Sequence, residues 1–154
     1  MLKYYLIALA LVGIDQYIKY LTLENIALHE VKEFLPGLMS LTYIQNTGAA
    51  MSILEGKMMF FYIVTVIVIG SIVYMFYKYG KEQPLFSTAL AFILGGAVGN
   101  FIDRLRFEYV VDMFKLEFIN FPIFNFADAA LTVGVILMMI QIFLEEKTTK
   151  RNMY

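Results

Sequence analysis

Residues Gly95 to Asp128 read GGAVGNFIDRLRFEYVVDMFKLEFINFPIFNFAD. This stretch leaves one apolar segment, crosses a short polar connection and enters the next apolar segment. We therefore expect Asp103, Asp112 and Asp128 near one face of a membrane. An ionised side chain at the centre of a membrane helix costs roughly 2.5 kcal/mol or more on insertion scales. Carboxylates that persist at such a boundary indicate either a functional site or internal pairing.

The composition is that of an integral membrane protein. Hydrophobic residues make up 60% of the 154 residues, and the mean hydropathy is +0.71, whereas soluble proteins are about 45–50% apolar. The formal net charge of −1 gives no basic surface for nucleic acid. The absence of cysteine excludes disulfides and thiolate sites. His29 is the only histidine and lies among glutamates, so we expect a solvated loop residue and neither a metal nor a cofactor.

The hydropathy pattern predicts an all-α membrane protein with four transmembrane helices, because about 20 apolar residues cross a bilayer. The spans are expected at residues 4–23, 58–77, 85–102 and 123–144 of a single domain covering 1–154. The polar residues 24–57 contain the turn signal Pro36-Gly37 followed by a strand-like run from Leu38 to Ile44. They predict a small extracytoplasmic β-rich surface segment. Because the first span contains Asp15 and Lys19 and lacks a small-residue cleavage site, it is not expected to be a removed signal peptide.

Basic side chains set the predicted orientation. One side would carry Lys3, Lys78, Lys81, Lys147, Lys150 and Arg151, and the other Lys32, Lys57, Arg104, Arg106 and Lys115. The difference favours both termini in the cytoplasm, more clearly so if Arg104 belongs to a site. On this topology the polar cluster lies near the extracytoplasmic face.

Ionisable residues of three spans share one depth. At a rise of about 1.5 Å per residue, Asp15 lies about 12 Å and Lys19 about 6 Å from the outer end of the first span. Asp128 lies about 7.5 Å into the fourth span by the same measure. Asn100 and Asp103 occupy the end of the third span. This coincidence of depth predicts one polar cluster in the outer half of the membrane.

Helical spacing allows structural as well as functional interpretations. Asp15 and Lys19 are an i, i+4 pair that would form an internal salt bridge. Gly96, Asn100 and Asp103 share one helical stripe, and Gly95 and Gly99 form a G-x-x-x-G on the next, which is typical of close helix packing.

Three polar residues of the same region also have purely structural interpretations. Asn125 suits a helix N-cap. Asp103 with Arg104 would be a boundary ion pair, and Asp112 would be a loop residue on a surface hairpin.

Asp128 lacks a basic neighbour in sequence and needs a partner from elsewhere. A second carboxylate that shares one proton with it would satisfy this need, as in aspartic proteases. In that chemistry an ionised Asp takes a proton from the attacking water, and a protonated Asp stabilises the oxyanion. The residues themselves do not choose between Asp103 and Asp112 as the second member.

Several blocks of the chain, taken together and in this order, resemble bacterial lipoprotein signal peptidase, the signal peptidase II family. They are Asp15-Gln16 with Lys19, Asn46-Thr47-Gly48-Ala49-Ala50, Gly95-Gly96-Ala97-Val98-Gly99-Asn100-Phe101-Ile102-Asp103-Arg104, Val110-Val111-Asp112 and Phe124-Asn125-Phe126-Ala127-Asp128. The resemblance implies an aspartic endopeptidase of the bacterial cytoplasmic (inner) membrane. It would cut prolipoproteins on the N-terminal side of the diacylglyceryl-modified lipobox cysteine.

The resemblance also implies roles for particular residues. Asp112 and Asp128 would be the catalytic pair. Supporting or substrate-binding roles would fall to Asp15, Lys19, Asn46, Gly48, Asn100, Asp103, Arg104 and Asn125. The expected partners are diacylglyceryl-modified prolipoproteins, membrane lipids and the inhibitor globomycin, with no nucleic acid.

Two features depart from the family pattern. Met113 stands where the family usually has Phe, and the connection from Asp112 to Asp128 is short.

Two other classes of function remain open. Ion-coupled transport would use intramembrane charges, but it should require them at both depths. A passive assembly subunit would use them only for helix packing.

Overall fold

The computed structural model describes residues 1–48, 57–80 and 83–151, with side chains to residue 147. Ala49, Ala50 and Lys81, which entered the family resemblance and the orientation argument, lie outside the described residues, as do the side chains of Lys150 and Arg151. Four helices are long and apolar enough to cross a membrane, so the predicted fold class is confirmed. They are α1 (Leu2–Asn25), α2 (Met58–Tyr79), α3 (Pro84–Phe107) and α4 (Phe126–Arg151).

The helices pack around α3, which contacts each of the other three. Small residues make this possible: a Cβ added to Gly95 would meet Leu11 Cβ of α1 at 2.8 Å, and one added to Gly96 would meet Leu131 Cγ of α4 at 2.7 Å. The close-packing interpretation of this glycine-rich segment is thus confirmed, with Gly96 facing α4. Large apolar side chains are exposed on the outer surfaces of the helices, where a bilayer would surround them.

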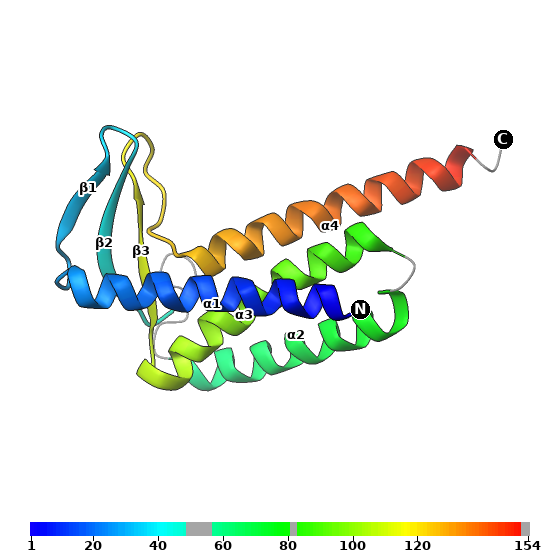
Figure 1. The fold of residues 1–154 in the computed structure, drawn as a ribbon, viewed down its shortest axis with the longest axis horizontal. Helices are drawn as coiled ribbons and strands as arrows, with labels where there is room; N and C mark the ends of the chain where they lie inside the picture. Colours follow the sequence, from blue (N-terminus) through cyan, green and yellow to red (C-terminus); the bar gives the residue numbers. More distant parts are fainter. Residues whose placement is uncertain (49–56, 81–82, 152–154) are drawn as a thin grey trace.

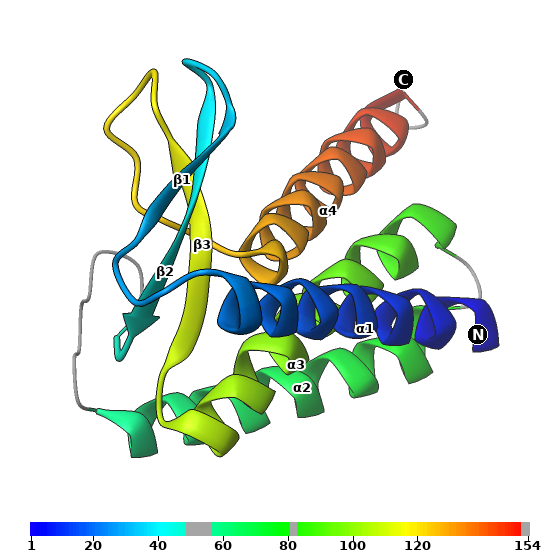
Figure 2. The same cartoon turned by 60° about the vertical axis from the view of Figure 1, so that its left-hand side comes forward.

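A three-stranded antiparallel sheet lies across one end of the helical layer, and the N-terminus and the C-terminal end of α4 lie away from it (Figure 1). Its strands are β1 (Val31–Leu35), β2 (Met39–Asn46) and β3 (Val110–Leu116), in that order across the sheet. The turn between β1 and β2 contains Gly37 at φ 69°, a conformation that glycine adopts without steric cost. The strands run across the helix axes in both views (Figure 2). The predicted strand and turn are confirmed.

Each helix differs from its predicted span at one end or both, and two of these boundaries lie beside the polar residues of the cluster. The third helix continues past the predicted end at residue 102 to Phe107, because its polar residues keep helical geometry until Glu108 turns to φ 62°. The fourth begins at Phe126 rather than 123. Phe124 still pairs with Phe114 of β3, its carbonyl accepting from the Phe114 backbone N–H at 2.8 Å, so the chain is extended there. As a result, Asp103 and Arg104 lie inside α3, and Asp128 lies in the first turn of α4.

The packing beneath the sheet fixes β3 against the helices. Ile26, Tyr43, Val111 and Met113 form one buried cluster. Met113, the departure from the family pattern, is fully buried and keeps the packing role expected of an apolar residue. Because Asp112 lies between two buried apolar neighbours, the strand presents it to the opposite face.

Candidate active site

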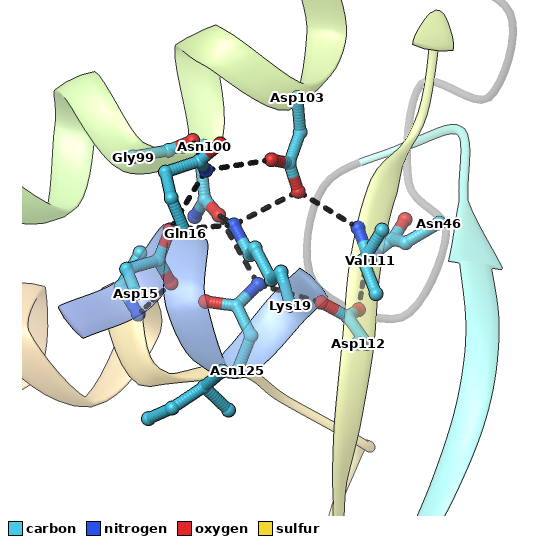
Figure 3. A network of polar contacts seen from close by, with 12 residues as sticks. Asp15, Gln16, Lys19, Asn46, Gly99, Asn100, Asp103, Val111, Asp112 and Asn125 are labelled. Atoms are coloured by element: carbon cyan, nitrogen blue, oxygen red, sulfur yellow. Dashed lines mark hydrogen bonds and ion pairs between the residues drawn. The ribbon is translucent and has the colours of Figure 1, made fainter. Parts of the chain in front are cut away.

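Lys19 is the centre of a buried ion-pair network between α1 and α3 (Figure 3). Its ammonium Nζ lies 2.9 Å from Asp15 Oδ2 and 2.9 Å from Asp103 Oδ2. It also donates to Asn100 Oδ1 at 3.0 Å. An ammonium has three N–H donors, so these acceptors satisfy it completely. The internal salt bridge predicted for Asp15 and Lys19 is confirmed.

The same two carboxylates also hold backbone groups of the elements that carry the other two acids. Asp15 Oδ1 accepts from the Ala127 backbone N–H at 2.9 Å. Asp103 Oδ2 accepts from the Val111 backbone N–H at 3.0 Å. Ala127 directly precedes Asp128, and Val111 directly precedes Asp112. Each of these carboxylates therefore fixes the backbone beside one of the proposed catalytic acids.

Asp112 lies on β3 and is 2% exposed. Asn125 Nδ2 donates to its Oδ1 at 2.7 Å, and Asn46 Nδ2 donates to its Oδ2 at 2.9 Å. Both amide orientations are set by backbone donors, since Gly48 N–H donates to Asn46 Oδ1 and Asp128 N–H donates to Asn125 Oδ1. The two amides must therefore present N–H groups to Asp112.

Asp128 lies in the first turn of α4 and is half-buried. Asn100 Nδ2 donates to its Oδ1 at 2.7 Å. Its Oδ2 accepts from the Asn125 backbone N–H at 3.2 Å, while its own N–H donates to Asn125 Oδ1 at 3.0 Å. This reciprocal pair is a capping box, and the helix N-terminus favours a negative charge here. The predicted N-cap role of Asn125 is confirmed, and the same side chain also reaches Asp112.

The pKa of Asp112 is raised to about 7, mainly by burial and in addition by the negative charge of Asp128. The amide donors of Asn46 and Asn125 act in the opposite direction. Desolvation outweighs them because the carboxyl is almost inaccessible to water. A proton can thus be held on Asp112 near neutral pH.

A cavity of about 660 Å³ opens beside both acids. Its polar wall consists of Asn46, Asn100, Arg104, Asp112 and Asp128. The remaining wall is mainly apolar and comes from β3, the β3–α4 connection and α4, including Leu116, Phe121, Phe124 and Leu131. A long substrate with an apolar portion fits such a wall.

Arg104 joins the site to the β2 end and to α2. Its Nη2 donates to the Gly48 carbonyl at 3.1 Å. Its Cζ lies 4.6 Å from the centroid of the Phe61 ring. Arg104 and Gly48 therefore lie at the rim of the same polar wall.

Comparison with known proteins shows the family of this chain. A family model for signal peptidase (SPase) II matches residues 7–144. A lipoprotein signal peptidase of Enterococcus faecalis is 56% identical over 149 residues, which cover 97% of this chain and 92% of the relative. This chain belongs to the signal peptidase II family.

Further similarities extend over nearly the whole chain. A lipoprotein signal peptidase of Listeria innocua is 52% identical over 96% of this chain and 97% of the relative. A bacterial membrane enzyme solved by the in meso method at 2.3 Å resolution matches with a TM-score of 0.92 and 38% identity, over 97% of this chain and 92% of that one. The signal peptidase II family supports a multi-pass membrane protease that acts on the signal peptides of lipoproteins.

Two structural alternatives drawn from the sequence are wrong for this signal peptidase II fold. Asp103 does not form a boundary pair with Arg104; its ion-pair partner among the described residues is Lys19. Asp112 is not a loop residue on a surface hairpin but a buried residue of strand β3. In both cases the deciding partner comes from a distant part of the chain.

Sequence reasoning gave Gln16 and Phe61 no role. Gln16 Nε2 donates to Asp103 Oδ1 at 2.8 Å and to the Gly99 carbonyl at 3.2 Å, so it steadies the ion-pair network from α1. Its polar side chain inside an apolar span was the available signal. Phe61 gave no signal, because α2 is apolar throughout its first turns.

Proposed function

We propose that this chain is an aspartic endopeptidase that removes signal peptides from prolipoproteins, with Asp112 and Asp128 as its catalytic pair. The observation that carries the proposal is that these two acids come from different elements and line one cavity. The Asn125 side chain joins them, because it donates to the Asp112 carboxyl and accepts from the Asp128 backbone N–H. Asp15 and Asp103 are committed to Lys19 and to backbone donors. Asp112 and Asp128, by contrast, line the cavity, where a substrate can reach them.

The reaction assigns different protonation states to the two acids. Asp112 carries the proton, since burial raises its pKa to about 7. Asp128 is the ionised member, at a helix N-terminus with donors from Asn100 and Asn125. Asp128 takes a proton from water as the water oxygen attacks the scissile carbonyl carbon. Asp112 donates a hydrogen bond to the developing oxyanion.

Collapse of the tetrahedral intermediate breaks the C–N bond. The proton held by Asp128 passes to the leaving nitrogen, which leaves a free amino group on the lipoprotein and a carboxylic acid on the signal peptide; that acid loses its remaining proton to water. Asp112 keeps its proton and Asp128 is again ionised, so the cycle closes. The preceding residues act by holding these groups: Asn46, Asn100 and Asn125 orient the carboxyls, and Asp15, Lys19 and Asp103 hold the backbone beside them.

The substrate follows from the family and from the cavity. We propose cleavage on the N-terminal side of a diacylglyceryl-modified cysteine, with the apolar wall taking the flanking apolar residues or acyl chains. Globomycin would compete for the same cavity. Gly48, whose carbonyl is held by Arg104, would lie against the substrate backbone.

The position in the cell is part of the same proposal. The chain would lie in the bacterial cytoplasmic membrane with both termini inside and the sheet on the extracytoplasmic surface. The scissile bond of a membrane-anchored prolipoprotein would then reach the acids without leaving the bilayer surface. Among the described residues, the buried Asp and Lys side chains all belong to this one cluster, which favours a single site over an ion path across the membrane.

The test is cleavage of a diacylglyceryl-modified prolipoprotein by purified wild type and by the Asp112→Asn, Asp128→Asn and Asp103→Asn variants. We expect the first two to lose activity by about a hundred- to ten-thousandfold, the range typical of a general acid or base, while circular dichroism shows an unchanged helix content. Asp103→Asn should keep part of the activity. If folded Asp112→Asn cleaved normally and folded Asp103→Asn were inactive, the proposed catalytic pair would be wrong.

A further inference from the structure

The guanidinium of Arg104 borders the cavity and has no carboxylate partner among the residues that the structure describes. None of the ion pairs among the described residues includes Arg104. Nη2 donates to the Gly48 carbonyl, whereas Nε is buried and has no hydrogen-bond partner within the described part of the chain. A buried donor without a partner is costly unless a ligand completes it. Arg104 therefore retains donor capacity beside Asp112 and Asp128.

The N-terminal part of α2 holds this group in place. Phe61 is 8% exposed, and its ring centroid lies 4.6 Å from Arg104 Cζ. The adjacent Tyr62 hydroxyl donates to the Arg104 carbonyl at 2.9 Å. A planar guanidinium over an aromatic face at this distance is attracted by the ring quadrupole, more strongly where water is excluded. Phe61 and Tyr62 thus fix the Arg104 side chain and backbone, respectively.

We propose that Phe61 is a positioning residue, which presents the Arg104 guanidinium to the cavity so that its free N–H donors bind a backbone carbonyl oxygen of the substrate peptide. The inference rests on the proposed peptidase function and names a recognition contact of that site. A neutral carbonyl is the favoured ligand because the ionised carboxylate of Asp128 lines the same polar wall and would repel a phosphate or a carboxylate.

Phe60 provides a matched control. It is the same residue type in the same turn of α2, but it is 49% exposed and contacts Phe61 edge-on at 5.8 Å. No cation–π contact is recorded for it among the described residues. Phe60→Leu therefore changes α2 as Phe61→Leu does, but without removing the platform under Arg104.

The experiment measures kcat and KM for prolipoprotein cleavage by Phe61→Leu, Phe61→Tyr and Phe60→Leu. It also measures the Kd of an uncleavable substrate peptide that is N-methylated at the scissile amide. For Phe61→Leu we expect KM and Kd to rise roughly tenfold, with kcat changed less than about threefold. Phe61→Tyr, which keeps an aromatic face, and Phe60→Leu should stay close to wild type.

Fluorinated phenylalanines at position 61 distinguish the cation–π role of Phe61 from a purely structural role. Added fluorines weaken the ring quadrupole with little change in size, so KM and Kd should rise in step with fluorination while the melting temperature stays level. Equal effects of Phe61→Leu and Phe60→Leu, or a flat fluorination series, would overturn the inference. If either result were found while wild type was active and Asp112→Asn inactive, the proposed peptidase function would stand, but the role of Phe61 would not. Because Kd needs no turnover, a failure of the proposed chemistry alone would leave the binding result decisive.

Discussion

The polar cluster at the sheet end of the helices contains four aspartates, and their hydrogen-bond partners divide them into two pairs. Asp15 and Asp103 accept from Lys19 and from backbone N–H groups, and both are almost completely buried. Asp112 and Asp128 accept mainly from asparagine amides and line the cavity. The sequence placed all four at similar depth but could not divide them, because every deciding partner is distant along the chain. Only the family resemblance selected Asp112 over Asp103.

The pH dependence of cleavage should reveal the proton on Asp112. Since its pKa is raised to about 7, Asp112 is protonated below that pH and loses its proton above it. Two ionised carboxyls can no longer stabilise an oxyanion, so kcat/KM should fall as the pH rises through about 7. The measurement is kcat/KM from pH 5 to 9 at constant ionic strength. A rate that stays level or increases up to pH 9 would be inconsistent with a protonated Asp112.

Lys19 should contribute strongly to stability because its removal leaves Asp15 and Asp103 buried without a cation. We expect Lys19→Met to lower the free energy of unfolding by about 3–5 kcal/mol, as for other broken buried pairs. Lys115→Met is the matched control, since Lys115 pairs with Glu117 at the surface and should change little. Thermal unfolding in detergent compares the two. Equal melting temperatures for both variants would contradict a structural role for Lys19.

Helix ends and strand pairing explain why depth and spacing predicted where the site lies but not its geometry. Apolar periodicity placed four helices and one strand correctly. It ended the third helix too early, since Asp103, Arg104 and Arg106 look like a boundary in a hydropathy profile. It could not show that β3 pairs with β2, with Asn46 opposite Val110 and Ile44 opposite Asp112. That register brings Asn46 to Asp112, and no local pattern encodes it.

The close approach of α3 and α4 depends on Gly96. A Cβ there would meet the Ala127 carbonyl and, at 2.7 Å, Leu131 Cγ, so the α4 N-terminus would have to move. We expect Gly96→Ala to cost about 1–3 kcal/mol of stability through overpacking and to reduce cleavage by displacing Asp128. Gly13→Ala, which has open space around the added Cβ, should be neutral or slightly stabilising. Melting temperatures and cleavage rates of both variants test this; a harmless Gly96→Ala would contradict it.

At the scale of the whole molecule, α3 is the common contact of all helices and the sheet caps one end of the layer. Composition and hydropathy were enough to predict this class of fold. The orientation in the membrane depends on a small difference in basic residues and stays a prediction. The N-terminus and the C-terminal end of α4 lie away from the sheet, so one chemical label at each end of the helical layer determines the orientation.

Cysteine labelling can test the orientation cleanly, because the chain has no cysteine of its own. In intact cells we expect a membrane-impermeant maleimide to modify Ile119→Cys, which is 48% exposed in the β3–α4 connection. Lys3→Cys, at the other end of the helical layer, should react only after the membrane is opened. The reverse pattern would place the sheet in the cytoplasm and contradict the proposed localisation.

The central claim is that Asp112 and Asp128 work as one catalytic unit. The most direct measurement compares cleavage rates of Asp112→Asn, Asp128→Asn and the double variant, all confirmed as folded. Groups that act together are strongly non-additive, so removing the second acid should add little to the loss caused by the first. The account predicts a double variant about as slow as the slower single variant. Losses that multiply would mean that the two acids act independently, and they would contradict the shared-proton mechanism.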